Sequence, residues 1–300
     1  MTQPRVIFVI MTYNQAQFVR PAVESALAQD FSPLEILISD DASYDGTWEI
    51  IREIADAYEG PHQIRLNRNS KNLSVDHIRH LTNELAGPGF FFLGAGDDVY
   101  MPNRVSRLME IQRETGALAI SSAAHKIDAS GKRIGEHPPE HIRKLKGDCS
   151  IETFIEAKLI PASFGAGLMW HSDLLEIFGP IPDGPRNSDE IMPFRAALLG
   201  KAAYTPEALL YWRKHSNNKT LQFRRGANEV ATLLLKEREI QNKMANFTSF
   251  IHDTMTLEQR TGATPQLANI RTELAMHLIT LNSAHKQLRH DLARRGWGVV

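Results

Sequence analysis

The sequence predicts an α/β protein with a mostly parallel sheet, helices on both faces of that sheet, and a helical extension after it. Over residues 5–98, short apolar runs alternate with amphipathic helical patterns, as parallel strands joined by crossover helices require. From residue 227 onward the apolar spacing is helical. With 300 residues, 42% of them hydrophobic, the chain can form one large α/β domain with an appended element.

The first strand and the first helix are predicted near the start of the sequence. Residues 5–11 (RVIFVIM) form a continuous apolar run rich in β-branched side chains, which is typical of a strand buried on both faces. Residues 18–27 then repeat apolar side chains at spacings of three and four, the pattern of an amphipathic helix. Pro21 is tolerated in that helix only within its first turn.

The same alternation continues through the next segments. A second strand is predicted at residues 34–39 (LEILIS), and the turn-rich stretch 40–46 ends it. Trp48, Ile51 and Tyr58 belong to the apolar spacing of the helix that follows. A strand, a helix and a strand are then predicted at residues 64–67, 75–85 and 90–93.

Polar side chains follow three of the predicted strands, at residues 12–14 (TYN), 40–41 (DD) and 97–98 (DD). In a doubly wound sheet, ligands bind beyond the carboxyl ends of the strands, so we expect these clusters to meet in one crevice. Aspartates beside Gly94 and Gly96 would suit a hard divalent cation and a diphosphate. On spacing alone, the same aspartates also fit turns and helix caps.

The second half of the sequence is less regular. Residues 128–148 form loops rich in Gly, Pro and His, and patterned segments return near residues 151–159 and 167–170. Thr264 and Pro265 supply an N-cap and a first-turn proline for a long helix. Its apolar stripe is compatible with a helix packed on its own domain, a dimerisation helix or a membrane-surface helix, and consists of Leu267, Ile270, Leu274, Leu278, Leu281, His285, Leu288 and Leu292.

Charge and cysteine content exclude several classes of protein. Lysine plus arginine (34) nearly cancels aspartate plus glutamate (35), so we expect no nucleic-acid partner. The single cysteine, Cys149, excludes an intrachain disulfide and fits a reducing cytoplasm. No apolar run reaches the roughly 18 residues that span a bilayer, and residues 1–5 lead into a strand rather than a signal peptide. We therefore expect a cytoplasmic protein, free or peripheral at the inner face of the membrane.

Several segments together resemble the family 2 glycosyltransferases. The opening βαβ signature of that family is similar to residues 9–14 (VIMTYN), 25–29 (SALAQ) and 35–47 (EILISDDASYDGT). Its metal turn, its later acid-rich segment and its closing segment are similar to residues 96–104 (GDDVYMPNR), 187–200 (NSDEIMPFRAALLG) and 207–215 (EALLYWRKH). The resemblance covers residues 5–216 and implies a GT-A fold and an inverting, metal-dependent transferase.

The resemblance also implies roles for individual residues. Nucleotide-sugar binding falls to Thr12, Tyr13, Asn14, Asp41 and Asp97, with Asp41 on the base. The metal, Mn²⁺ or Mg²⁺, would be held by Asp97 with Asp98 beside it, and by His215 as a further ligand. The catalytic base is implied in the acid-rich segment, at Asp189 or Glu190.

Two positions depart from the family pattern. The first aspartate of the usual Asp-x-Asp metal motif is replaced at Ala95. The usual Glu-Asp of the base motif reads Ser188-Asp189-Glu190, which leaves two acids as candidates for the base. The spacing of six residues to Arg195 favours Asp189 over Glu190.

The resemblance implies transfer of a sugar from a nucleoside diphosphate donor to a glycan, lipid-linked or other hydroxyl acceptor in polysaccharide or glycan biosynthesis. UDP is the expected nucleotide, with dTDP and GDP as alternatives. We expect a transferase domain at 1–220, with a nucleotide-sugar half at 1–116 and an acceptor half at 117–220, and a helical extension at 221–300.

Two other functions compete with this interpretation. A catalytically degenerate domain could act as a binding or scaffold module, with the C-terminal helix as its partner surface and a homodimer as one outcome. A nucleotidyltransferase would need a basic loop for a nucleoside triphosphate near the first strand, and residues 11–20 offer only Arg20. The sequence contains neither a P-loop nor a GxGxxG fingerprint, so it does not favour a kinase or an NAD enzyme.

Overall fold

The computed structural model describes residues 4–84, 88–138, 149–156, 165–182, 188–216, 218 and 229–295. The chain divides into two compact units. The first contains residues 1–181 and 188–213, and the second contains residues 182–187 and 214–300. The expected domain boundary after residue 220 lies outside the described residues and stays a prediction.

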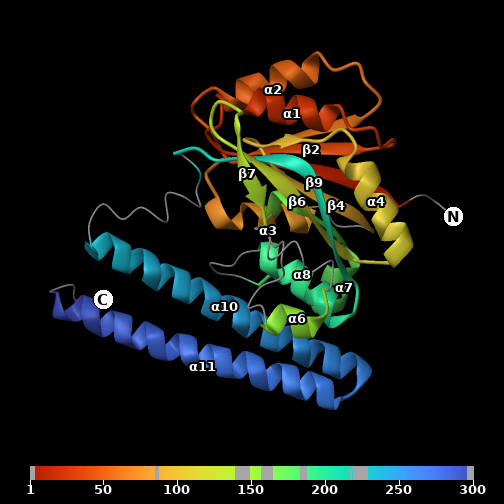
Figure 1. Ribbon diagram of the computed structural model, residues 1–300. Coiled ribbons are helices and arrows are strands. Elements are labelled where there is room, and N and C mark those ends of the chain that lie inside the picture. Colours follow the sequence, from red (N-terminus) through yellow and green to blue (C-terminus); the bar gives the residue numbers. More distant parts are fainter. Residues whose placement is uncertain are drawn as a thin grey trace. The chain divides into compact units, whose positions relative to one another are not determined.

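Four parallel strands form one half of the sheet in the first unit. They are β1 (Arg5–Thr12), β2 (Glu35–Asp40), β3 (Gln63–Arg68) and β4 (Gly89–Ala95), and they lie in the order β3-β2-β1-β4 (Figure 1). All three pairings are parallel. This part of the fold confirms the strands predicted from the apolar runs.

The other half of the sheet mixes directions. Here β8 (Leu168–His171) pairs antiparallel with both β4 and β6 (Ala119–Ile127), and β6 pairs parallel with β9 (Ala202–Arg213). Two short strands, β5 (Val99–Tyr100) and β7 (Arg133–His137), add antiparallel to β9 and β6. The nine described strands therefore belong to one mixed sheet.

Helices cover both faces of the parallel strands. Helix α1 (Val19–Leu27) and α2 (Thr47–Asp56) lie side by side, because β1, β2 and β3 follow one another in a single direction across the sheet (Figure 1). Helix α3 (His77–Glu84), after the short η1 (Ser74–Asp76), connects β3 back to β4 beyond β1, and a right-handed crossover in that direction uses the opposite face.

Further short elements of the first unit surround the mixed half of the sheet. They are α4 (Arg104–Thr115), α6 (Ile151–Glu156), η2 (Gly165–Gly167), α7 (Asp173–Phe178) and α8 (Ser188–Leu198). Every residue from Val6 to Ile10 in β1 is buried, as expected for a strand covered on both faces. On α1, the buried residues are Val19, Ala22, Val23 and Ala26, the stripe predicted by its spacing.

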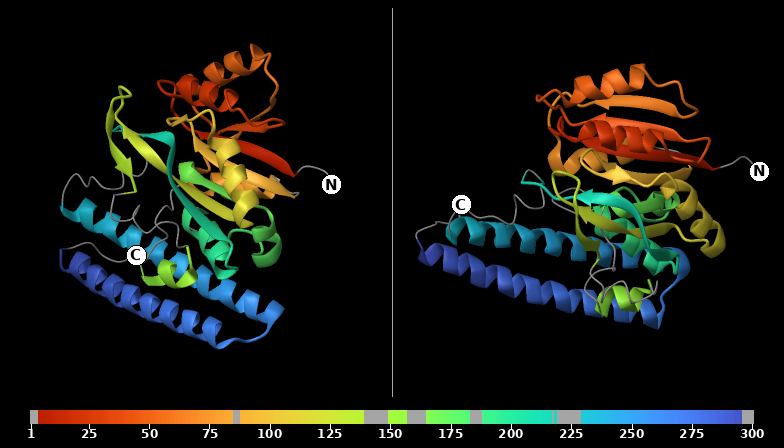
Figure 2. Two further views of the ribbon diagram at one scale, coloured as in Figure 1. Left: turned by 45° about the vertical axis from the view of Figure 1, so that its right-hand side comes forward. Right: turned by 45° about the horizontal axis from the view of Figure 1, so that its top comes forward.

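The second unit contains a helical hairpin. Helices α10 (Glu229–Thr261) and α11 (Pro265–Arg294) pack along each other, and Figure 2 shows them running side by side. Thr264 caps α11 by accepting the N–H of Leu267, and Pro265 occupies the first helical position, as predicted. Glu237 of α10 pairs with His285 and Arg289 of α11.

The apolar stripe of α11 is covered along its whole length. Leu267, Ile270, Leu274 and Leu292 are buried and the other stripe residues are half-buried, whereas Met276 and Ile279, which lie outside the stripe, are each 59% exposed. None of the helices among the described residues carries an apolar stretch long enough to cross a membrane. A dimeric or membrane-surface role for the stripe stays a prediction.

Candidate active site

The carboxyl ends of three neighbouring strands bring the predicted polar clusters to one edge of the sheet. Strand β1 lies between β2 and β4, with Thr12 opposite Asp40 and Met11 opposite Ala95. Because the residues that follow these strands leave the same edge, residues 12–14, 40–41 and 97–98 form one polar region. The expected convergence of the clusters therefore holds for the backbone.

Asp40 organises the turn after β2. Its buried carboxylate accepts the hydroxyl of Thr12 at 3.0 Å and the N–H and hydroxyl of Ser43 at 2.9 and 2.5 Å. The guanidinium of Arg68 lies 3.6 Å away. Thr12, which we expected at the nucleotide, thus directs its hydroxyl to Asp40 and supports the turn.

Residues 13 and 14 join the loops after β1 and β2. Asn14 adopts a left-handed conformation with φ of 50°, and its N–H donates to the hydroxyl of Ser43 at 2.8 Å. Its side-chain oxygen accepts the N–H of Tyr44 at 3.1 Å. The Tyr13 ring meets the ring of Tyr44 edge to face, and Tyr44 is 83% exposed. These contacts leave an aromatic pair at the surface of the polar region.

Asp41 holds the segment that follows β3. Its buried carboxylate accepts the side-chain amide of Asn69 at 2.9 Å and the N–H groups of Leu73 and Ser74 at 2.8 and 2.9 Å. A carboxylate offers about four acceptor positions, so these three bonds leave room for one further donor. The expected contact of Asp41 with a nucleotide base is compatible with this structural role.

The Asp97–Asp98 turn is fixed by β9. Asp98 accepts the N–H of Arg213 at 2.9 Å, and the Nε of Arg213 donates to the carbonyl oxygen of Asp97 at 2.9 Å. The Arg213 guanidinium also lies over the ring of Phe18, 5.0 Å from its centroid. Arg213 was not among the site residues predicted from the sequence, although it stands two residues before His215, which the resemblance implies as a metal ligand.

Both glycines before this turn have packing reasons. A Cβ at Gly96 would lie 2.6 Å from a methyl carbon of Thr12, and a Cβ at Gly94 would lie 2.5 Å from the hydroxyl of Tyr100. A side chain at position 96 would push the turn away from Thr12 at the end of β1, and one at position 94 would push it away from Tyr100. The expectation that these glycines admit a diphosphate stays a prediction beside this structural reason.

Asp189 lies in the first turn of α8, which begins at Ser188. Its carboxylate accepts the N–H of Gly165, from η2, at 2.8 Å. A Cβ at Gly165 would lie 2.8 Å from the carboxylate, so a glycine is needed for this approach. Glu190 also lies in the first turn and is partly exposed. The contact with Gly165 fixes the position of Asp189.

His215 belongs to the second unit. Its backbone N–H donates to the side-chain oxygen of Asn218 at 2.6 Å, and the Asn218 amide nitrogen lies 3.1 Å from its Nε2. Asn218 therefore orients the imidazole. The role of His215 as a metal ligand stays a prediction.

A metal site made of protein side chains alone is not found in the part of the chain that the structure describes, where no three His, Cys, Asp or Glu residues group around a common point. Asp97 and Asp98 offer hard oxygen donors on one turn. Mg²⁺ and similar cations take about six oxygen ligands, so diphosphate and water oxygens would supply most of them. This donor set fits a cation that is bound together with a diphosphate.

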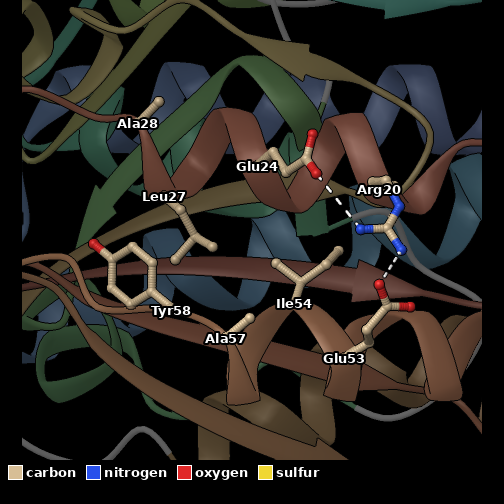
Figure 3. Close-up of a pocket in the computed structure, with 8 residues that line it drawn as sticks. All are labelled: Arg20, Glu24, Leu27, Ala28, Glu53, Ile54, Ala57 and Tyr58. Atoms are coloured by element: carbon tan, nitrogen blue, oxygen red, sulfur yellow. Dashed lines mark hydrogen bonds and ion pairs between the residues drawn. The ribbon is translucent and has the colours of Figure 1, made fainter.

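A pocket of about 350 Å³ lies elsewhere, between α1 and α2 (Figure 3). Arg20 at one end pairs with Glu53 at 2.9 Å and with Glu24 at 3.7 Å, and Leu27 and Tyr58 line the other end. None of the residues that line it is a predicted site residue. The pocket is therefore separate from the polar region at the strand ends.

Comparison with known proteins gives matches to glycosyltransferases. The family model described as "Glycosyl transferase family 2" matches residues 7–176. An uncharacterized glycosyltransferase of Nostoc sp. is 25% identical over 251 residues, which cover 81% of this chain and 74% of that protein. The UDP-Glc:alpha-D-GlcNAc-diphosphoundecaprenol beta-1,3-glucosyltransferase WfaP of Escherichia coli is 44% identical over 137 residues, which cover 45% of this chain and 52% of that protein.

A solved structure supports the fold. A mannosyltransferase from Pyrobaculum calidifontis, in complex with GDP-Man and Mn²⁺, superposes with a TM-score of 0.57 and 17% identity. The superposition covers 96% of this chain and 85% of that one. At this identity the likeness concerns the fold, and it confirms the expected GT-A architecture.

Proposed function

Because this chain belongs to glycosyl transferase family 2, we propose that it transfers a sugar from a nucleoside diphosphate sugar to an acceptor hydroxyl in glycan biosynthesis. The observation that carries the proposal is the position of Asp41 and of the Asp97–Asp98 turn, which follow β2 and β4 on either side of β1. Both lie where doubly wound sheets bind nucleotides.

The donor is proposed to be a UDP sugar, held by Tyr13, Asn14 and Asp41. Thr12 supports these residues through Asp40. The remaining acceptor position of Asp41 suits a base that presents an N–H, as uracil does. The E. coli relative is named for UDP-Glc, and the superposed mannosyltransferase holds GDP-Man, so both nucleotides belong in a test.

Asp97 and Asp98 are proposed to hold Mn²⁺ or Mg²⁺ together with the diphosphate, and His215 to contribute a further ligand. When bound, such a cation offsets the negative charge that grows on the departing diphosphate. Arg213 donates to the main-chain carbonyl oxygen of Asp97, and this bond does not involve the Asp97 carboxylate.

Asp189 is proposed as the general base of an inverting reaction. An acceptor hydroxyl attacks the anomeric carbon from the face opposite the leaving diphosphate, through an oxocarbenium-like transition state. The hydroxyl proton passes to the Asp189 carboxylate, which the N–H of Gly165 holds in place at 2.8 Å. A positioned base contributes about 10²- to 10⁴-fold to the rate.

The proposal is tested by nucleotide release from a panel of UDP, dTDP and GDP sugars, with Mn²⁺, Mg²⁺ or EDTA, and with glycan or lipid-linked acceptors. We expect release from a UDP sugar that depends on the cation. A matched thermal melt with each nucleotide measures binding without turnover, since a ligand of the native state raises its melting temperature. Stabilisation by a nucleotide without turnover of any donor would favour a binding module instead.

A further inference from the structure

Arg104, the first residue of α4, is a fully buried cation. Its guanidinium lies over the rings of Phe8, Tyr100 and Phe92, at 4.9, 5.2 and 5.9 Å from their centroids. Burial lowers the pKa of Arg104 to about 10, so it remains charged at neutral pH. A buried charge lowers stability unless its surroundings compensate for it.

The hydrogen bonds of Arg104 link two separate segments of the candidate site. Its Nη2 donates to the carbonyl oxygen of Leu93 at 2.9 Å and to the carbonyl oxygen of Ala166 at 2.7 Å. Leu93 lies in β4, just before the Asp97–Asp98 turn. Ala166 lies in η2 and directly follows Gly165, which donates its N–H to Asp189.

This arrangement is poorly explained by core packing alone. Within the described residues, Nε and Nη1 of Arg104 have no hydrogen-bond partner. Replacing a buried charge by an apolar side chain of similar volume is often neutral or stabilising. What an apolar side chain does not provide is a charged nitrogen such as Nη2, which donates to the carbonyls of both Leu93 and Ala166.

We propose that Arg104 is a positioning residue that ties η2 to β4 and thereby holds the Gly165 N–H against the carboxylate of Asp189. The inference rests on the proposed function in one respect, the role of Asp189 as base. The geometric part, in which Arg104 fixes η2, stands apart from that role.

The fit at Gly165 leaves little tolerance for movement. Its N–H lies 2.8 Å from one carboxylate oxygen of Asp189, and the position of its missing Cβ is 2.8 Å from the other. Without the bond from Arg104, the Ala166 carbonyl loses a charged donor and η2 is free to shift. A misplacement of about 1 Å in a reacting group can lower turnover by about 100-fold.

The test compares Arg104→Met, Arg104→Lys and a matched control, Leu108→Ala. Leu108 is fully buried on the same helix but bonds to neither carbonyl, so its truncation destabilises α4 without removing the tie. Hydrogen exchange at the Gly165 amide reports the tie without any turnover. Donor KM, kcat and the pH profile of kcat report its effect on the reaction.

In Arg104→Met we expect exchange at Gly165 to rise and kcat to fall by about 10- to 100-fold, with donor KM changed much less. The acid limb of the kcat profile should move to higher pH, because a hydrogen bond donated to a carboxylate favours its ionised form. Arg104→Lys should show smaller changes in the exchange at Gly165 and in kcat than Arg104→Met, since an ammonium group can reach one of the two carbonyls. Leu108→Ala should lower the melting temperature and leave the exchange at Gly165 and the pH profile unchanged.

Unchanged exchange at Gly165 in Arg104→Met overturns the proposal, whatever the activity. Faster exchange with an unchanged kcat and pH profile also overturns it, because the tie then has no effect on the base. If Arg104→Met does not fold, the same criteria apply to Arg104→Lys. Wild-type turnover in Asp189→Asn instead removes the proposed base, and the exchange experiment still decides whether Arg104 fixes η2.

Discussion

Individual residues of the site combine stabilising the fold with the chemistry proposed for them. Asp98 accepts the backbone N–H of Arg213, and Asp41 accepts three donors from the segment after β3. Because a carboxylate keeps further lone pairs after accepting one or two bonds, these contacts orient it for a ligand. Loss of such a side chain therefore lowers both the stability of the fold and the affinity for the ligand. A test of binding needs a substitution that changes the affinity without changing the stability.

At Asp97 the bond from Arg213 goes to the main-chain carbonyl oxygen, which Asn retains, and Asn also keeps the shape of the side chain. We expect Asp97→Asn to weaken Mn²⁺-dependent binding of UDP by at least the roughly 10- to 100-fold typical of losing a residue that supports a metal. Its melting temperature without ligand should stay close to that of the wild type. Calorimetric titration of UDP with and without Mn²⁺ measures the effect. Equal metal-dependent affinity in both proteins would remove Asp97 from the metal site.

Asp189 and Glu190 are separated by a pair of conservative substitutions. Adjacent residues of a helix point about 100° apart, so one of the two carboxylates faces the acceptor. Asp189→Asn keeps an oxygen for the Gly165 N–H but accepts no proton, so kcat should fall by about 10²- to 10⁴-fold with donor affinity unchanged. Glu190→Gln should lower kcat far less. Steady-state kinetics with the true acceptor measures both, and the opposite ranking would assign the base to Glu190.

At the scale of elements, Asp45 fastens the loop after β1 to the start of α2. Its carboxylate accepts the N–H of Ala16 at 3.0 Å and the hydroxyl of Thr47 at 2.5 Å, and that hydroxyl also accepts the N–H of Gln15 at 2.8 Å. Burial raises the pKa of Asp45, but the hydrogen bonds that its carboxylate accepts from Thr47 and Ala16 outweigh burial and hold the pKa below its usual value. This connection between the loop and α2, which we call the Asp45 clasp, therefore depends on an ionised carboxylate.

This dependence gives a pH effect with a defined sign. A carboxyl group with a lowered pKa in the folded state binds its proton more readily in the unfolded state, so it stabilises the fold above its ordinary pKa near 3.8. That contribution is lost as pH falls through the lower folded value. We expect the stability difference between wild type and Asp45→Asn to be largest near neutral pH and to shrink below about pH 4. Urea unfolding across this range measures it, and a constant difference would contradict the clasp.

The elements that the sequence predicted are those with a local pattern. Strands β1, β2 and β4 stand out because nearly continuous apolar runs mark strands buried on both faces, whereas none of the β3 residues is buried. Strand β8 coincides with the patterned segment expected near residues 167–170, but its antiparallel pairing with β4 and β6 is not encoded in any local spacing. Arg104 and Arg213 were missed as buried residues because arginine is normally exposed, and their partners lie far along the sequence.

At the scale of the whole molecule, the division into two units separates the proposed donor residues from the helical hairpin. Tyr13, Asp41 and Asp97 lie in the first unit, and His215 follows the boundary between Arg213 and Lys214. Helices α10 and α11 lie in the second unit and are joined by pairs such as Arg271 with Glu258. The hairpin can thus be weakened at a position remote in sequence from every proposed donor ligand.

Donor binding should stabilise the protein independently of the hairpin. Leu274→Ala removes a side chain of α11 that is only 1% exposed, and truncating a buried leucine costs about 2–5 kcal/mol. UDP with Mn²⁺ at 100 times its Kd should add about 2.7 kcal/mol to the stability of the native state. We expect differential scanning calorimetry to show that gain in Leu274→Ala as in the wild type, and to show its metal-dependent part lost in Asp97→Asn. Loss of the gain in Leu274→Ala would mean that the hairpin takes part in donor binding.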